Sequence, residues 1–352
     1  MFGLLVCLAI AGVAACGGSS GSTEIVGAGS TAQEVAQKAW IREFEIEEPD
    51  VKVTYQPVGS GDGRKRFLKG EAAYATTDVP FERWQLTEAV QRCKPGKVVE
   101  VPVYISNVIV VFNIGKTSEI YLTPSTLARI FNLQITHWRD PEIRRENPSI
   151  TKFHGEITRV WVAIESGITE AFTQYLSEAA PKDWTRGSSE WYPVTIEAQS
   201  VASPKELVET LYANDGTITF LDASQQKGLK TVSIKTGNGP RDLAVPSPGV
   251  AARILETSPE EKSLKKSPYM LPFKLNRTGH PKQYYPLTLV SYLVGCTSYD
   301  SPEEAAAVRG LFEYAVGREG QLIAQEEAGA DFLRGKLQKR AEAAVHAIEA
   351  GA

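Results

Sequence analysis

Apolar and polar residues follow two periods along this chain, one typical of strands and one typical of helices. Residues 51–58 alternate, with Val51, Val53 and Tyr55 on one side, which predicts a half-buried strand. Residues 32–43 carry apolar side chains at helical spacing. By these criteria we expect strands at 23–26, 51–58, 72–77, 98–113, 158–163, 217–221 and 285–294. We expect helices at 32–43, 64–69, 125–132, 170–179 and 204–213, mostly loops at 237–283, and a helical tail that includes 303–317 and 331–349. Strands that alternate with helices predict an α/β fold with largely parallel sheets.

Two of the predicted strands are long and far apart in the sequence. They span 98–113 and 285–294, and we expect each to cross between two lobes. The first lobe would then hold 24–104 with 284–352, and the second 105–283. Folds of this class bind ligands in the cleft at the carboxyl ends of their strands.

Three turns rich in glycine and serine join a strand to a helix. They are 27–31 (GAGST), 59–63 (GSGDG) and 165–169 (ESGIT). The first N–H groups of a helix lack partners and carry the positive end of the dipole, so such turns suit an anion. Each turn alone is equally a plain helix cap. Three like turns in one chain favour an anion site.

Composition narrows the class of protein. The 352 residues suffice for two domains, and 42% hydrophobic with 23% charged residues indicates a soluble protein with a core. The net charge is −4, and no basic stripe is present, which argues against a nucleic-acid partner. An acidic total is compatible with an anion site built from backbone dipoles and hydroxyls.

The first residues predict export. Residues 1–15 are almost wholly apolar yet too short to span a bilayer, as in a secretory signal. Residues 13–16 (VAAC) resemble a bacterial lipobox, in which Cys16 would be lipidated and become the mature N-terminus. The Gly/Ser run at 17–22 would be a flexible tether. A plain secretion signal is the alternative.

The other cysteines and the histidines are sparse. Cys7 falls in the signal, which leaves Cys93 and Cys296 as either a disulfide or two buried thiols in an exported protein. The four histidines are scattered, so we expect no metal site.

Enzyme motifs are weak, and we expect a protein that is not an enzyme and needs no cofactor. A G-x-S-x-G match at 17–21 lies in the tether, and the start of a dinucleotide fingerprint at 27–29 is not continued. Asp78 and Glu165 could form a carboxylate pair, but the sequence places no nucleophile beside them. No ATP-binding phosphate loop is present.

Several segments occur in the order seen in one known family. Besides 27–31, they are 56–61 (QPVGSG), 75–80 (ATTDVP), 136–141 (THWRDP), 165–176 and 285–292 (YPLTLVSY). Over about 24–335 the chain resembles the phosphate-binding proteins of bacterial ABC importers, the PstS family, and is most similar to lipoproteins of high-GC Gram-positive bacteria. The resemblance implies a two-lobed, type II periplasmic-binding-protein fold with a ligand cleft between the lobes.

The resemblance also implies a function. The protein would be a monomer, anchored through Cys16 to the outer face of the plasma membrane. It would capture inorganic phosphate and deliver it to the permease and ATPase subunits of an importer.

Site residues follow from the same resemblance, position by position. Asp78 would accept a hydrogen bond from a protonated phosphate oxygen and so reject sulfate. The three turns would donate to the other oxygens through Ser30, Thr31, Ser60, Gly61, Ser166 and Gly167.

The third turn departs from the family pattern R-x-D-x-S-G-T. Val162 stands at the arginine position, Ile164 at the aspartate and Ile168 at the threonine, and Thr169 could replace the lost hydroxyl. Asp62 also stands where the family has glycine. These changes leave an alternative open, a degenerate member that binds phosphate weakly or another small ligand and acts as a sensor or surface protein.

Overall fold

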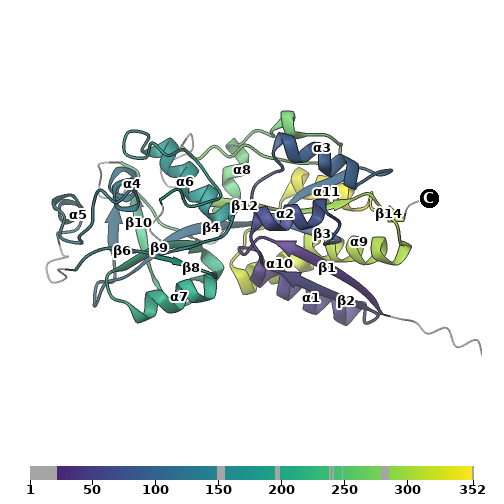
Figure 1. Ribbon diagram of the computed structural model, residues 1–352, viewed down its shortest axis with the longest axis horizontal. Coiled ribbons are helices and arrows are strands. Elements are labelled where there is room, and N and C mark those ends of the chain that lie inside the picture. The colour runs from purple at the N-terminus through teal and green to yellow at the C-terminus, as the bar shows by residue number, and fades with distance from the viewer. Residues whose placement is uncertain are drawn as a thin grey trace, which may run out of the picture.

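Two α/β lobes lie side by side in this protein. The computed structural model describes residues 22–148, 155–194, 199–237, 239, 242–247, 249–278 and 285–350. The long strands β4 (Val98–Asn113) and β12 (Thr288–Cys296) run between the lobes (Figure 1). Cys16 and the rest of the signal lie outside the described residues. No helix in the described ranges has the length and apolar character needed to span a bilayer.

The first lobe is built on three parallel strands. β1 (Thr23–Gly29) pairs with β2 (Val51–Gln56) on one side and with β3 (Tyr74–Thr77) on the other. Its helices are α1 (Glu34–Glu47), α2 (Ser60–Leu68), α3 (Arg83–Arg92), α9 (Pro302–Val316), α10 (Arg318–Ala328) and α11 (Gly335–Val345).

The apolar stripe on α1 explains why the C-terminal helices pack on this lobe. Ala36, Trp40 and Phe44 recur every four residues and are all buried. Trp40 Nε1 donates a hydrogen bond to the Gly320 carbonyl at 2.6 Å, which ties α1 to α10.

The second lobe surrounds β9 (Thr217–Asp222), which pairs antiparallel with β4 and parallel with β6 (Thr158–Arg159). An aromatic cluster fills its core, with Phe172 and Phe220 stacked at 4.1 Å and Phe131 edge-on to both. The remaining strands are β5 (Ile120–Leu122), β7 (Trp161–Val162), β8 (Ser200–Val201), β10 (Lys230–Lys235) and β11 (Leu243–Ala244). The helices are α4 (Pro124–Phe131), α5 (Pro141–Glu146), α6 (Gly167–Ala179), α7 (Pro204–Ala213) and α8 (Ile254–Thr257).

The crossing strands join both lobes into one continuous sheet. β12 pairs antiparallel with β3 and with the first part of β4, and the second part of β4 pairs with β9. The sheet is therefore mixed, because the two crossing strands run antiparallel to their neighbours. The register between β4 and β12 shifts at Ser291 and Tyr292.

The predicted two-lobed α/β fold is confirmed, and β4 and α7 have the predicted bounds. The helix predicted at 64–69 begins at Ser60, so the second turn is itself helical. Gly63 permits this, since a Cβ there would lie 2.3 Å from Gly29 Cα. The strand predicted at 158–163 is split into β6 and β7, and α3 has no counterpart among the predicted elements. The predicted bounds of the two lobes stay a prediction, because β4 runs through residue 104 without interruption.

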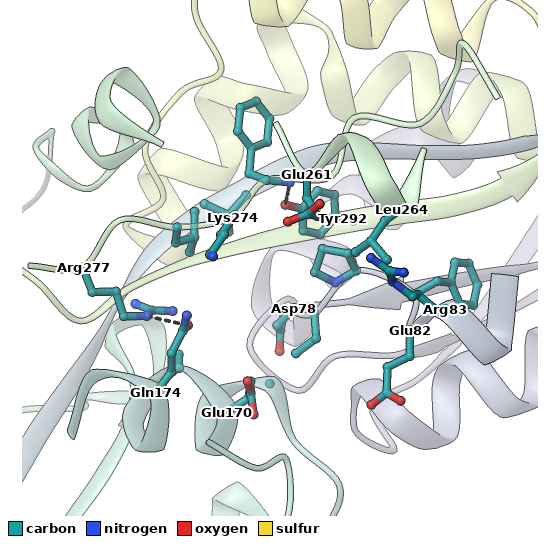
Figure 2. Close-up of a pocket in the computed structure, with 18 of the residues that line it drawn as sticks. Asp78, Glu82, Arg83, Glu170, Gln174, Glu261, Leu264, Lys274, Arg277 and Tyr292 are labelled. Carbon is teal, nitrogen blue, oxygen red and sulfur yellow. Dashed lines mark hydrogen bonds between the residues drawn. The ribbon is translucent and has the colours of Figure 1, made fainter. Parts of the chain in front are cut away.

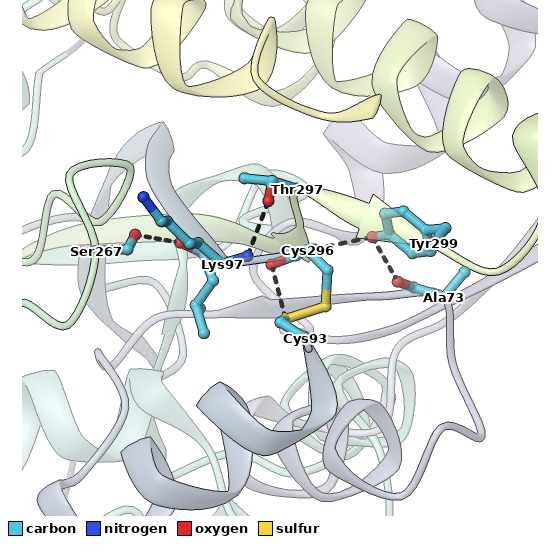
Figure 3. Close-up of a disulfide and its surroundings, with 9 residues drawn as sticks. Ala73, Cys93, Lys97, Ser267, Cys296, Thr297 and Tyr299 are labelled. Atoms are coloured by element: carbon cyan, nitrogen blue, oxygen red, sulfur yellow. Dashed lines mark hydrogen bonds between the residues drawn. A yellow bond between two sulfur atoms is a disulfide. The ribbon is translucent and has the colours of Figure 1, made fainter. Parts of the chain in front are cut away.

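Cys93 and Cys296 are joined by a disulfide, with their Cα atoms 5.1 Å apart (Figure 3). Cys93 follows the last residue of α3, and Cys296 ends β12. Tyr299, on the short strand β13 (Ser298–Tyr299), donates to the Ala73 carbonyl at 3.0 Å and accepts from the Cys296 N–H at 3.1 Å. β13 pairs with the terminal strand β14 (Glu349–Ala350). The disulfide thus joins the end of α3 to the end of the crossing strand β12.

Candidate functional site

The three glycine–serine turns meet where the lobes touch. The Gly59 N–H donates to the Gly29 carbonyl at 2.8 Å, which joins the second turn to the first. The Gly61 N–H donates to the Glu165 carbonyl at 3.3 Å, which joins the second turn to the third across the two lobes. The predicted anion site is therefore assembled from both lobes.

The first turn leads into α1 and is buried. Ser30 donates its N–H to Thr76 Oγ1 at 2.7 Å, and its hydroxyl oxygen accepts from the N–H groups of Ala32 and Gln33 at 3.1 and 3.2 Å. Thr31 is only 3% exposed, and its carbonyl accepts from Gln225 Nε2 at 3.1 Å. Ser30 thus closes the turn that precedes α1, and its hydroxyl lies within hydrogen-bonding reach of the Asp78 carboxylate.

Asp78 follows β3 and lies between the second and third turns. Its N–H donates to Ser60 Oγ at 3.1 Å, and its carboxylate accepts from the hydroxyls of Ser60 and Ser291. Burial raises the pKa of this carboxyl to about 6, while hydrogen bonds from Ser291, Ser30 and Ser60 act in the opposite direction. At neutral pH the group is mainly ionised and serves as an acceptor.

The third turn begins α6 in the second lobe. Ser166 caps the helix by accepting from the Ile168 N–H at 3.2 Å, and its own N–H donates to the Glu190 carbonyl at 3.0 Å. At position 167 only glycine fits, because a Cβ there would lie 2.2 Å from Asp78 Cβ. Thr169 is buried within the first turn of α6. Asp78 and the start of α6 are thus in direct contact across the cleft.

The gap between the first and third turns is small and partly apolar. Thr31, Ser166 and Thr169 line a cavity of about 20 Å³ together with Val162 and Ile168. A cavity of this size holds about one water molecule. Val162 and Ile168, which stand where the family has arginine and threonine, therefore form part of the cavity wall.

A much larger compartment opens on the other side of Asp78 and Gly167. It has a volume of about 600 Å³ and is bounded by the loop after β3, one face of α6, the segment 261–277 and β12 (Figure 2). Most of it comes from residues that the sequence predicts as loops. No pattern in the sequence groups Lys274 and Arg277 with Asp78.

Comparison with known proteins identifies the superfamily. A family model described as the PBP superfamily domain matches residues 14–319. The chain belongs to the PBP superfamily. Phosphate-binding protein PstS2 of Mycobacterium bovis (strain BCG) is 28% identical over 348 residues, which cover 94% of this chain and 90% of the relative. Phosphate-binding protein PstS 3 of Mycobacterium leprae is 27% identical, covering 87% and 81%.

Solved structures of phosphate-binding proteins share the fold. A high-affinity periplasmic phosphate-binding protein (PfluDING) with bound phosphate superimposes with a TM-score of 0.73 at 19% identity, covering 91% of this chain and 93% of that one. A phosphate-binding protein from Stenotrophomonas maltophilia gives a TM-score of 0.70 at 18% identity, with the same coverage. The relatives and these structures confirm the predicted resemblance and the two-lobed architecture.

A buried ion pair that the sequence does not predict joins the two lobes of this PBP superfamily member. Arg64 of α2 forms a two-pronged ion pair with Glu190, with Nη2 to Oε2 at 2.6 Å and Nη1 to Oε1 at 3.2 Å. Both side chains are buried, and Arg64 Nη1 also donates to Thr77 Oγ1 at 2.8 Å. Because Glu190 is 126 residues away, no local motif could indicate the pair. It joins the two lobes beside Asp78 and Ser166.

A second buried carboxylate predicts a pH effect on stability. Glu100 of β4 is fully buried, accepts from the Phe81 N–H at 3.1 Å, and leaves Oε2 without a partner among the described residues. Burial raises the pKa of the Glu100 carboxyl from 4.5 to about 7. Folding therefore favours protonated Glu100. The contribution of this protonation to the free energy of unfolding is fully present below pH 4.5 and is lost as the pH rises through about 7. We expect Glu100→Gln to reduce the fall in unfolding free energy between pH 5 and 8, by up to about 3 kcal/mol. Urea denaturation at both pH values measures this, and equal falls for both proteins would contradict it.

Proposed function

We propose that this protein is an extracytoplasmic solute-binding protein that captures inorganic phosphate between its lobes and delivers it to an ABC importer. The observation that carries the proposal is the meeting of three glycine–serine helix starts around Asp78. Helix N-termini can donate their N–H groups to an anion, and here the Gly61 N–H becomes free to do so when it separates from the Glu165 carbonyl. Relatives named as phosphate-binding proteins, which match most of the chain, support this function over a degenerate sensor or surface protein.

The residues have distinct roles in this proposal. Asp78 accepts a hydrogen bond from a protonated phosphate oxygen and excludes sulfate, which would place unprotonated oxygens against a carboxylate. The donors to the other oxygens are the amides or hydroxyls of Ser30, Thr31, Ser60, Gly61, Ser166, Gly167 and Thr169. A gap of about 20 Å³ must widen to admit phosphate, so the lobes separate about β4 and β12 and close again on the ligand.

The proposal extends to partners and location. The chain acts as a monomer, performs no catalysis, and presents its closed lobes to a permease whose ATPase drives transport. Cys16 carries the lipid that holds it at the outer face of the plasma membrane. Names of relatives as binding proteins support the absence of catalysis.

Titration calorimetry of the mature chain tests the function. Inorganic phosphate should bind with a single site, and sulfate should give no saturable heat. Phosphate binding no tighter than sulfate binding would overturn the proposal.

Thr31→Val is expected to weaken phosphate binding about tenfold, because a hydroxyl that donates to a charged oxygen is removed from a dry site. The same titration measures the loss. Thr87→Val, an identical change on the exposed face of α3, is the matched control and should bind as the parent does. An unchanged affinity in Thr31→Val would place the anion elsewhere.

Cys16→Ala is expected to move the protein from the membrane fraction to the culture medium of a Gram-positive host. A lipid chain on Cys16 would be the main membrane attachment, so its loss should release most of the protein. Immunoblots of both fractions measure this, and retention in the membrane fraction would contradict lipidation at Cys16.

A further inference from the structure

The large compartment beside Asp78 exceeds what inorganic phosphate needs. Its volume of about 600 Å³ falls in the range of sites for small organic molecules, about 300–1,000 Å³. It also reaches two residues of the predicted phosphate site, since Asp78 and Gly167 are part of its lining. A phosphoryl group bound at Asp78 could therefore carry a substituent that extends into the compartment.

One wall of the compartment carries a buried cation. Arg277 is 3% exposed, donates from Nε to Gln174 Oε1 at 2.8 Å and from Nη1 to the Thr288 carbonyl at 2.7 Å. Within the described ranges it forms no ion pair with a carboxylate. Burial lowers its pKa to about 10, and Glu178 and Glu170 are near enough to oppose that shift. A buried guanidinium without a paired carboxylate is stabilised by an anionic ligand.

A second cation lies on the same wall. Figure 2 shows the Lys274 side chain directed, like that of Arg277, toward the open space above Asp78 and Glu170. Lys274 is exposed, so its ammonium group can turn toward a ligand. The lining also has apolar surface from Phe81, Val290 and the ring of Tyr292, and carboxylates from Glu82, Glu170 and Glu261. The compartment thus combines apolar surface with Lys274 and Arg277 on one wall, and carboxylates elsewhere in its lining.

We propose that the cleft also binds phosphate monoesters that carry a second anionic group. The phosphoryl group lies at Asp78 and the start of α6, the organic part lies against the apolar side chains of the lining, and the second anion meets Lys274 and Arg277. This inference rests on the proposed function, because both ligands place a phosphoryl group at Asp78.

Titration calorimetry of the mature chain with three probes tests the inference. The probes are inorganic phosphate, glycerol 3-phosphate and 3-phosphoglycerate, of which only the last adds a carboxylate. We expect all three to bind. Lys274→Ala should weaken 3-phosphoglycerate binding about tenfold, as for one lost charged hydrogen bond, and leave the affinities for the other two unchanged. Lys266→Ala, on the same segment but outside the compartment lining, is the matched control and should change none of the three.

The outcomes separate this inference from the proposed function. If phosphate binds and neither ester does, or if Lys274→Ala alters all three affinities equally, the inference is wrong and phosphate binding stands. If 3-phosphoglycerate binds with the Lys274 dependence and phosphate does not, the compartment is supported and the inorganic ligand is wrong. If no probe binds, both are overturned.

Discussion

Replacing Arg64 with alanine is expected to lower the free energy of unfolding by about 3–5 kcal/mol and to weaken phosphate binding. The change would leave the Glu190 carboxylate buried between the lobes without its partner, and an unpaired buried charge is strongly destabilising. Binding suffers as well, because the Glu190 carbonyl accepts from the Ser166 N–H and so positions the third turn. Urea denaturation and phosphate titration measure the two effects.

The structure provides a matched control for Arg64. Lys65, the next residue of α2, also joins the two lobes through an ion pair with Glu165 at 2.5 Å, but Lys65 is nearly half exposed. An exposed pair contributes only about 0–1 kcal/mol, so Lys65→Ala should change little. Arg64→Met with Glu190→Leu should recover most of the stability, because no charge is left unpaired. A loss in Lys65→Ala equal to that in Arg64→Ala would contradict a special role for the buried pair.

Restoring the family pattern at the third turn is expected to strengthen phosphate binding about a hundredfold. The double change Val162→Arg and Ile164→Asp adds a guanidinium beside Thr31 and Ser166, together with the carboxylate that orients it. A charge-assisted hydrogen bond in a dry site contributes about 1.5–3 kcal/mol, which corresponds to about ten- to a hundredfold in affinity. Phosphate titration of the parent and the double variant measures the gain.

The single changes serve as controls for this gain. Ile164→Asp alone places a carboxylate near the anion without its partner, so phosphate binding should weaken. Val162→Arg alone should bind more weakly than the double variant, because no carboxylate orients the guanidinium. If the double variant binds no more tightly than the parent, the anion does not reach the space beside Val162.

Much of the fold could be predicted because its strongest patterns are local. The uninterrupted apolar run of β4 and the capped, amphipathic helix α7 have the bounds that their sequences indicate. The sequence does not predict helix α3, because few of its residues are apolar and it buries Gln85 with Leu86 and Ala89. The second turn is predicted to precede its helix, but α2 begins within it at Ser60, where Gly63 packs against Gly29.

The candidate site was predictable only in part. The three turns could be found from their residue types, because each lies between a strand and a helix, and Asp78 follows from the resemblance. Ser291, Glu190 and Arg277 could not, since each reaches the cleft only through tertiary packing of segments distant in sequence. The resemblance indicated which residues were replaced at 162, 164 and 168, but not that the space beside them is reduced to about 20 Å³.

A crystal structure of the mature chain with inorganic phosphate tests the central claim most directly. We predict one phosphate between the N-termini of α1, α2 and α6, with an oxygen within hydrogen-bond distance of Asp78. We also predict that Val162 and Ile168 move apart from Thr31 to make room for it. Phosphate bound only outside this space, with the three helix starts still in mutual contact, would contradict the account.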